Sequence, residues 1–441
     1  MLFGTDGVRG IVDKDINPEI AYNIGKGFAM YLKENKVSGK VLIGCDTRIS
    51  SDTYMYAVAC GVANYNFDVD IVGIIPTPGI SYLVLNNKEY IGGVMITASH
   101  NDSTYNGIKI FNSYGEKTSK DVEDKIENNI AKEACNCINK GKIRYDEQIL
   151  TSYIKNLITT FENRISKVKI VIDSANGSNY AIAPYVYRTL GAEVIEINCN
   201  NDGVNINNNC GANHIEQLQQ TVLKSKADIG IAFDGDGDRL RVVLSDGKVI
   251  SGDDILLALA LNFKKKNRLN NLLVAGTIMT NGGTENALRN HGIKLMRSDV
   301  GDKNLVMLMK DNGIAIGGES SGHICIYNYI RSCDALYNSL EFVSCLLEDD
   351  VELLNIINSN FVIPSVTKNV VISDEFRKTF NTNINVDRDI INIKKQYPDS
   401  RIIVRPSGTE SVIRIYVEGT DCVVNQEIVE KIEKILVNYQ L

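Results

Sequence analysis

The chain repeats one pattern three times: an apolar strand, a polar loop, a helix that ends near Gly or Asn, and a second apolar strand. The copies span residues 41–72, 168–195 and 272–295. Strands that alternate with helices in this way are typical of layered α/β structure with parallel strands. Because the copies begin more than a hundred residues apart, the repeat predicts three similar domains rather than a solenoid of short units.

The last part of the chain follows a different pattern. Residues 401–404 and 412–417 are apolar strands on either side of a tight loop, and residues 425–439 have the apolar spacing of a helix. This stretch predicts a small α+β domain after a hinge at Pro364-Ser365. A length of 441 residues fits about three or four domains. We expect four, and we place them at 1–150, 151–252, 253–365 and 366–441.

The composition argues against several classes of protein. The formal net charge of −7 argues against nucleic acid as the main partner, and no apolar run has the length of a membrane span. The N-terminus lacks the basic and apolar regions of a signal peptide. The ten cysteines have no repeating spacing, and their one close pair is Cys135 and Cys137, which favours reduced thiols over disulfides or a zinc site. We therefore expect a cytoplasmic protein.

Three carboxylates at alternate positions, Asp234, Asp236 and Asp238, follow the apolar run 229–233. That run predicts a buried strand, so the carboxylates emerge together at its C-terminal end. Like charges this close repel one another unless a cation lies among them, and hard oxygen ligands suit Mg²⁺ or Mn²⁺. An EF-hand is excluded because Arg239 stands where its glycine is required. A solvated acidic turn is the plain alternative to a divalent-metal site that serves phosphate chemistry.

A second loop, residues 97–101, follows the apolar strand 93–96 and contains Ser99 and His100. A serine at the end of a strand, beside a histidine, can be an exposed nucleophile, although an ordinary polar turn is the alternative. Lys109 follows in the same segment. It could neutralise the charge of a transferred phosphoryl group or assist proton transfer.

Two further loops carry groups suited to a phosphorylated sugar. Residues 317–323 form a glycine-rich loop whose polar side chains could hold sugar hydroxyls. Its G-x-S-x-G match does not predict an α/β-hydrolase, because no histidine follows His323. Residues 405–410 combine an arginine fork with serine and threonine hydroxyls, which suits phosphate. Neither a Walker loop nor a dinucleotide fingerprint occurs, and a structural turn is the alternative for both loops.

Together with the opening segment, these four loops resemble the α-D-phosphohexomutase superfamily, and within it the bacterial phosphoglucosamine mutases. The opening residues Phe3-Gly4-Thr5-Asp6-Gly7-Val8-Arg9-Gly10 are similar to the start of that subfamily, as is Gly44-Cys45-Asp46-Thr47-Arg48. The loops occur in family order, and the resemblance spans nearly the whole chain. It implies three similar α/β domains with mixed sheets and a small C-terminal α+β domain around a central cleft, to which each domain contributes one loop.

The resemblance implies an isomerase that interconverts glucosamine 6-phosphate and glucosamine 1-phosphate through a phosphoserine enzyme and a bound 1,6-bisphosphate. Ser99 would carry the phosphoryl group, and one Mg²⁺ per subunit would be bound by an oxygen on Ser99 and by Asp234, Asp236 and Asp238. A hexose 1,6-bisphosphate would be the activator, the partner would be a small phosphosugar, and a homodimer is compatible with the family. The other implied roles are catalytic for Arg9, His100, Lys109 and Arg239, and substrate-binding for Glu319, Ser321, His323, Arg405, Ser407, Gly408 and Thr409.

Several positions depart from the family pattern. Asp102 and Ser411 replace common prolines, Ser320 stands where phosphoglucosamine mutases usually have Asn or Gln, and the segment 325–334 is atypical. These departures keep open a phosphomannomutase or phosphoglucomutase with the same mechanism. A non-catalytic phosphosugar-binding relative is a separate alternative. A metal phosphatase is a weaker alternative. Which residue serves as general base, Lys109 or His100, is also open.

Overall fold

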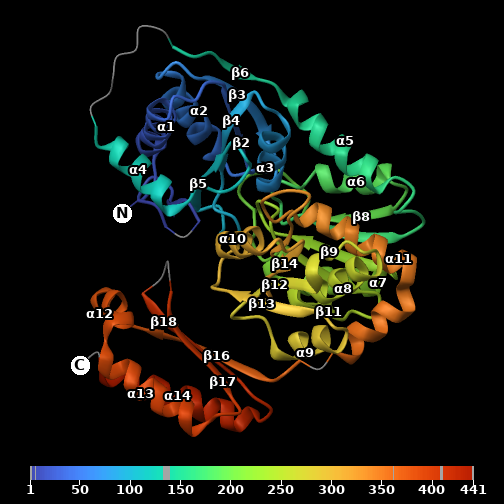
Figure 1. Ribbon diagram of the computed structural model, residues 1–441. Helices are drawn as coiled ribbons and strands as arrows, with labels where there is room; N and C mark the ends of the chain where they lie inside the picture. Colours follow the sequence, from blue (N-terminus) through green and yellow to red (C-terminus); the bar gives the residue numbers. More distant parts are fainter. Residues whose placement is uncertain (1, 5, 133–139, 361, 408–410, 440–441) are drawn as a thin grey trace. The chain divides into compact units, whose positions relative to one another are not determined.

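The computed structural model describes residues 2–4, 6–132, 140–360, 362–407 and 411–439 (Figure 1). The chain divides into two compact units, one of residues 1–279 with 292–358 and one of residues 280–291 with 359–441. Within the described ranges, none of the helices combines the length and the apolar character that crossing a membrane requires.

The first sheet of the larger unit has six strands in the order β1-β5-β4-β2-β3-β6. Strands β4, β2, β3 and β6 are parallel, β5 pairs antiparallel with β4, and β1 at the edge pairs antiparallel with β5. The strands are β1 (Val8–Ile11), β2 (Lys40–Cys45), β3 (Asp68–Ile74), β4 (Tyr90–Ile96), β5 (Tyr105–Asn112) and β6 (Ile143–Tyr145). The helices of this part are α1 (Pro18–Glu34), α2 (Ser51–Ala63), α3 (Thr77–Asn86) and α4 (Lys120–Ile130).

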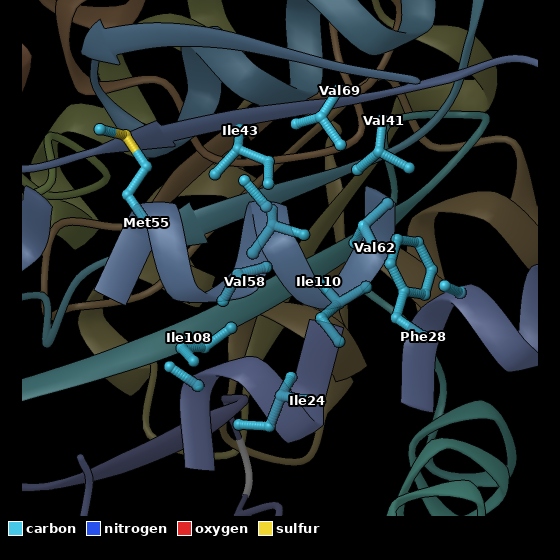
Figure 2. Close-up of a cluster of buried hydrophobic side chains, with 14 of the residues drawn as sticks. Ile24, Phe28, Val41, Ile43, Met55, Val58, Val62, Val69, Ile108 and Ile110 are labelled. Atoms are coloured by element: carbon cyan, nitrogen blue, oxygen red, sulfur yellow. The ribbon is translucent and has the colours of Figure 1, made fainter. Parts of the chain in front are cut away.

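The core of this part lies between the sheet and the helices α1 and α2. Figure 2 shows Met55, Val58 and Val62 of α2 clustered with buried side chains of α1, β2 and β5. These three residues are about one helical turn apart, so they share one face of the helix. Burial of each side chain is worth about 1.5–3 kcal/mol. The two helices pack closely at Gly25, where a Cβ atom would lie 2.3 Å from the carbonyl oxygen of Val58.

Two further mixed sheets complete the larger unit, in the orders β11-β10-β9-β7-β8 and β13-β12-β14-β15. The first contains β7 (Lys169–Asp173), β8 (Glu193–Ile197), β9 (Ile229–Phe233), β10 (Leu240–Leu244) and β11 (Val249–Ile250), with the helices α5 (Leu150–Phe161), α6 (Ile182–Thr189) and α7 (Glu216–Ser225). The second contains β12 (Leu273–Thr277), β13 (Lys294–Ser298), β14 (Ile316–Gly318) and β15 (Ile324–Ile326), with the helices α8 (Gly252–Lys265), α10 (Asp302–Asn312) and α11 (Ala335–Ser359).

In each of these three sheets, a parallel strand is joined to an antiparallel neighbour by a short loop. The pairs are β4 with β5, β9 with β10, and β14 with β15. The loops between them, residues 97–104, 234–239 and 319–323, are three of the four that the sequence singled out. Ligands of open α/β sheets bind outside the carboxyl ends of the parallel strands. The fold therefore presents the candidate residues at equivalent places in three similar sheets.

The smaller unit contains an antiparallel sheet in the order β16-β18-β17. Apolar side chains of its strands and helices form a separate core. Its elements are α9 (Gly282–Asn290), β16 (Ser365–Val371), α12 (Asp374–Thr379), α13 (Ile384–Gln396), β17 (Arg401–Pro406), β18 (Val412–Glu418) and α14 (Cys422–Asn438). The predicted class, three α/β sheets with a small C-terminal α+β domain, is confirmed. The boundaries at 150, 252 and 365 stay a prediction.

Candidate active site

The aspartate triad lies in the loop that follows β9. All three side chains are buried, and one oxygen of each lies within 4.8 Å of the others. Asp234 Oδ1 accepts hydrogen bonds from the backbone N–H groups of Asp238 at 3.2 Å and Arg239 at 3.1 Å. Gly235 is required by close packing, because a Cβ atom there would lie 2.7 Å from the carbonyl oxygen of Ser99. The loop is thus folded around its own first carboxylate.

Burial and mutual repulsion set the charge of the triad. Burial, together with the carboxylates of Asp238 and Asp236, raises the pKa of Asp234 to about 8. Burial also opposes the ionisation of Asp238, but Lys109 outweighs it and holds the pKa of Asp238 well below its usual value. Asp236 Oδ1 is buried and has no hydrogen-bond partner in the described part of the chain. Clustered hard oxygens, one of them unsatisfied, fit a divalent cation such as Mg²⁺.

Ser99 reaches the triad from the loop that follows β4. Its Oγ lies 3.1 Å from Asp234 Oδ2 and 3.4 Å from His100 Nδ1. Its backbone N–H donates to Thr97 Oγ1 at 2.9 Å. The φ angle of Ser99 is 53°, in the left-handed region that residues other than glycine rarely adopt. The predicted nucleophile therefore lies beside the predicted metal ligands, in a conformation that its surroundings must hold.

His100, Arg9 and Arg239 lie around Ser99 and the aspartate triad. Arg9 Nη1 donates to Asn101 Oδ1 at 2.9 Å, and Arg239 Nε lies 3.2 Å from His323 Nε2. Burial, followed by the charges of Arg239 and Arg9, lowers the pKa of His100 to about 3. The imidazole of His100 is therefore neutral near pH 7.

Lys109 Nζ is surrounded by carboxylates. It lies 2.7 Å from Asp236 Oδ2, 3.0 Å from Asp6 Oδ2 and 3.4 Å from Asp238 Oδ2. Lys117 binds the second oxygen of Asp6 at 2.6 Å. Burial opposes the charge of Lys109, but Asp236, Asp6 and Asp238 raise its pKa well above the usual value. Lys109 is therefore a fixed cation, which can offset negative charge but has no lone pair to accept a proton.

The glycine-rich loop between β14 and β15 joins this cluster through His323. His323 Nδ1 lies 2.7 Å from Glu319 Oε2, and Nε2 lies 3.2 Å from Asp238 Oδ1. Against the effect of burial, Asp238 and Glu319 raise the pKa of His323 to about 10. A protonated ring donates from both nitrogens, so the contact with Asp238 takes precedence over the one with Arg239. Ser321 Oγ lies 3.4 Å from His323 Nδ1.

The structure brings together the site residues that the sequence predicted in the larger unit. Ser407 lies in the smaller unit, where its N–H donates to the carbonyl oxygen of Val412 at 2.9 Å, and Arg405 lies on β17 of the same unit. Gly408 and Thr409 lie outside the described residues, as do Cys135 and Cys137. The residues brought together are Arg9, Ser99, His100, Lys109, Asp234, Asp236, Asp238, Arg239, Glu319, Ser321 and His323.

Further residues without a predicted role also contact the site, and Thr77, Arg48 and Asn207 are among them. Thr77, the first residue of α3, donates from Oγ1 to Asp236 Oδ2 at 2.5 Å. Arg48 Nη2 and Asn207 Nδ2 donate to the carbonyl oxygen of Ser99 at 3.1 and 2.8 Å. Arg48 stands in the segment 44–48, whose polar residues after an apolar strand were a signal without an assigned role. Thr77 and Asn207 carry no sequence signal that separates them from ordinary turn residues.

Comparison with known proteins agrees with this geometry. Residues 1–136, 151–247 and 251–361 match alpha/beta/alpha domains I, II and III of the phosphoglucomutase/phosphomannomutase family, and residues 369–435 match its C-terminal domain. The chain belongs to this family. It is similar to the phosphoglucosamine mutase of Thermoanaerobacter pseudethanolicus, with 39% identity over 434 residues that cover 95% of each chain.

Two solved structures share the fold. A phosphoglucomutase/phosphomannomutase family protein from Burkholderia thailandensis superposes with a TM-score of 0.84 at 21% identity, over 99% of this chain and 97% of that chain. The N-acetylphosphoglucosamine mutase of Aspergillus fumigatus, solved in complex with GlcNAc-6P and magnesium, gives a TM-score of 0.73 at 15% identity, over 100% of this chain and 96% of that chain.

Proposed function

We propose that this chain is a phosphoglucosamine mutase, which interconverts glucosamine 6-phosphate and glucosamine 1-phosphate. The observation that carries the proposal is the position of Ser99 Oγ, 3.1 Å from Asp234 at the edge of a buried triad of carboxylates. The amino sugar as substrate is supported by the likeness to a phosphoglucosamine mutase at 39% identity over 95% of the chain.

The proposed metal is one Mg²⁺ per subunit, held by Asp234, Asp236, Asp238 and an oxygen on Ser99. When bound, Mg²⁺ offsets negative charge on the phosphoryl group that is transferred. The buried cation Lys109 supplies further positive charge from the protein, and Arg9 and Arg239 add to it. Phosphoryl transfer depends mainly on such positioning and charge stabilisation.

In the proposed cycle, phospho-Ser99 transfers its phosphoryl group to a free hydroxyl of the hexose phosphate. The bond between phosphorus and Ser99 Oγ breaks, a bond to the sugar oxygen forms, the hydroxyl proton passes to a base, and Ser99 Oγ takes up a proton in place of the phosphoryl group. The bound hexose 1,6-bisphosphate then turns around, and its other phosphoryl group returns to Ser99 Oγ. A hexose 1,6-bisphosphate from solution would activate unphosphorylated enzyme by the same transfer.

Geometry favours His100 over Lys109 as the base. His100 Nδ1 lies 3.4 Å from Ser99 Oγ, within reach of the proton that Ser99 Oγ gains when its phosphoryl group leaves and gives up when a phosphoryl group returns. The nitrogen of Lys109, by contrast, is engaged by three carboxylates. We assign Lys109 to charge stabilisation and His100 to proton transfer.

The remaining predicted residues would bind the sugar phosphate. Glu319 is held by the N–H of Gly301 at 2.9 Å and by His323, so its carboxylate is fixed in position to accept sugar hydroxyls, with Ser321 beside it. Arg405 and Ser407, with Gly408 and Thr409, would bind the phosphate that does not react, because an arginine fork matches phosphate oxygens.

Substrate preference tests the proposal. We would measure kcat/KM for glucosamine 1-phosphate, mannose 1-phosphate and glucose 1-phosphate with Mg²⁺ and a hexose 1,6-bisphosphate. A strong preference for glucosamine 1-phosphate is expected. A preference for mannose or glucose would make the chain a phosphomannomutase or phosphoglucomutase of the same mechanism. Absence of turnover of all three would leave the phosphosugar-binding alternative.

The role of Ser99 is tested by Ser99→Ala. This variant should lose mutase turnover, because alanine lacks the hydroxyl that would carry the phosphoryl group, and its melting temperature should stay near that of the wild type. Ser103→Ala, in the same loop, is the matched control and should retain turnover. Substantial isomerisation by Ser99→Ala would remove Ser99 as the phosphoryl carrier.

The metal assignment is tested by Asp236→Asn. Replacing a charged ligand by a neutral one should lower turnover at a fixed Mg²⁺ concentration by about a hundredfold, with partial recovery at high Mg²⁺. Turnover is measured over a Mg²⁺ titration. An Mg²⁺ dependence equal to that of the wild type would contradict this assignment.

A further inference from the structure

The backbone of Ser99 requires an external constraint. A non-glycine residue in the left-handed region is strained relative to its ordinary conformation, and Ser99 has a φ angle of 53°. Asn and Asp tolerate this region better than Ser. Relaxation of Ser99 to negative φ would carry its Oγ away from Asp234, so the contact at 3.1 Å depends on whatever holds the loop.

Both terminal nitrogens of the Arg48 guanidinium group donate hydrogen bonds to this loop. Nη2 donates to the carbonyl oxygens of Ser99 at 3.1 Å and Asn101 at 2.7 Å. Nη1 donates to the carbonyl oxygens of Tyr105 at 2.9 Å and Asp102. The last N–H, on Nε, donates to Asp46 Oδ2 at 2.8 Å, so Asp46 anchors the guanidinium group.

These contacts use all five N–H donors of an arginine. The side chain of Arg48 is 0% exposed, so it has neither a free donor nor a surface with which to bind substrate. Asp46, which anchors Arg48, also accepts from Thr97 Oγ1 at 2.7 Å, and Thr97 in turn holds the N–H of Ser99. The N–H and the carbonyl group of Ser99 are therefore both tied to Asp46.

Asn207, from the second α/β sheet region, also binds the Ser99 loop. Its Nδ2 donates to the carbonyl oxygens of Ser99 and Asn101, each at 2.8 Å. Its own backbone is anchored by a hydrogen bond from its N–H to the carbonyl oxygen of Ala175 at 2.9 Å. The Ser99 loop is thus held from two parts of the larger unit, because Arg48 follows β2 and Asn207 precedes β9.

We propose that Arg48 and Asn207 are positioning residues for phosphoryl transfer, which hold Ser99 in its left-handed conformation and keep its Oγ on Asp234. This inference rests on the proposed function, because it assumes that Ser99 carries the phosphoryl group. The N–H donors of both side chains are taken up by Asp46 and by backbone carbonyl groups, so we expect neither to bind the transferred group. Their loss should therefore slow phosphoryl transfer and leave the KM for the hexose phosphate nearly unchanged.

Asn207→Gly is the first test, because glycine adopts the φ angle of 56° at this position without strain and removes only the side chain. We would measure the rate at which glucose 1,6-bisphosphate phosphorylates Ser99, by intact-protein mass spectrometry, together with kcat and KM. The phosphorylation rate and kcat should fall by about tenfold to a hundredfold, with KM changed less than about threefold. Asn209→Gly is the matched control, since Asn209 has a φ angle of 51° in the same loop and is exposed.

Arg48→Lys is the second test. Lysine keeps the charge beside Asp46 but cannot reach four carbonyl groups, so the same kinetic pattern is expected with a larger loss. Because Arg48 is buried, its replacement could also destabilise the fold, so the melting temperature of the variant is measured as well. If this variant fails to fold, Asn207→Gly still decides the question.

Hydrogen exchange separates a failure of this inference from a failure of the proposed function. Exchange of the peptide that covers residues 97–106 should rise in Asn207→Gly and stay at the wild-type level in Asn209→Gly. Wild-type phosphorylation rates together with unchanged exchange in Asn207→Gly would overturn the positioning role. If the wild-type enzyme takes no phosphate on Ser99, the proposed function is wrong. The positioning role in catalysis is then wrong as well, even if hydrogen exchange rises in Asn207→Gly.

Discussion

At the scale of single residues, Thr77 shows how a side chain outside the site loops can set the geometry of a proposed metal ligand. Its N–H donates to the carbonyl oxygen of Asp236 at 2.9 Å, and its Oγ1 donates to Asp236 Oδ2 at 2.5 Å. Lys109 binds the same oxygen at 2.7 Å. One oxygen of Asp236 is therefore fully engaged, and the other, Oδ1, is left for a cation.

Thr77→Val should weaken metal binding while leaving the fold intact, since valine has nearly the same shape but no hydroxyl. Loss of a hydrogen bond to a metal-binding side chain typically costs about 10–100-fold in metal affinity or activity. The Mg²⁺ concentration at half-maximal turnover should rise accordingly. Thr77→Ser keeps the hydroxyl and should behave like the wild type. An unchanged Mg²⁺ requirement in Thr77→Val would show that the hydrogen bond does not orient Asp236.

The residues of the candidate site could be predicted from sequence because their types are unusual in combination. Three alternating aspartates after an apolar strand have few structural uses, so Asp234, Asp236 and Asp238 were found without the fold. Arg48, Thr77 and Asn207 act through contacts with residues 51, 159 and 108 positions away. Such contacts exist only after the chain has folded, so no local pattern could reveal them.

At the scale of elements, the atypical segment 325–334 builds a cluster of tyrosines around a buried carboxylate. Tyr329 stacks on Tyr337 with ring centroids 3.7 Å apart. The hydroxyl groups of Tyr153 and Tyr329 donate to Asp334 Oδ2 at 3.0 and 3.2 Å. Tyr153 lies on α5 and Tyr337 on α11, so the segment ties helices from two of the sheet regions together around Asp334.

Burial raises the pKa of Asp334 to about 6, although its hydrogen bonds oppose the shift. In the unfolded chain the carboxyl has a pKa of about 3.9. Below about pH 4 both states are protonated, and between about pH 4 and 6 only the unfolded state ionises. Stability is therefore lost as the pH rises through this window, by about 3 kcal/mol in total.

Asp334→Asn should remove this pH dependence, because the amide does not ionise. As the pH is raised from 4.5 to 7.5, the urea midpoint of the variant should rise relative to that of the wild type. The reason is that the folded wild type buries an ionised carboxylate above about pH 6. Midpoints are compared rather than free energies, since a chain of several domains need not unfold in two states. A difference between variant and wild type that does not change with pH would contradict the buried, neutral carboxyl.

Element prediction succeeded where apolar periodicity was strong and failed at element ends. The C-terminal helix was predicted at 425–439 and is found at Cys422–Asn438. The helix of the first repeat begins at Ser51, where the polar and aromatic residues of its first turn hide the apolar period. Helix α9 was placed with the third repeat by sequence order, yet it belongs to the smaller unit, where the N–H of Gly282 donates to Glu418 at 3.2 Å.

At the scale of the larger unit, ion pairs connect α10 of the third sheet region to the first sheet region. Lys117 binds Asp302 Oδ2 at 2.6 Å, and it also binds Asp6, which contacts Lys109 at the site. A line of alternating charges therefore runs from the start of α10 to the carboxylate triad. Two more ion pairs connect the same helix to the first sheet region. One is more buried than the other, so their contributions to the stability of the fold should differ.

Lys303→Met and Lys310→Met, both on α10, should therefore differ in their effect on stability. Lys303 lies 2.5 Å from Glu123, whose side chain is 3% exposed, whereas Lys310 is 53% exposed and lies 2.8 Å from Glu116. Removing Lys303 leaves a buried carboxylate without its cation, which should cost about 1–3 kcal/mol. Removing Lys310 should cost at most about 1 kcal/mol, and less as salt is added. The test is the melting temperature of each variant at low and high salt. Equal losses would show that α10 is held by packing rather than by the buried ion pair, because methionine retains most of the apolar stem of either lysine.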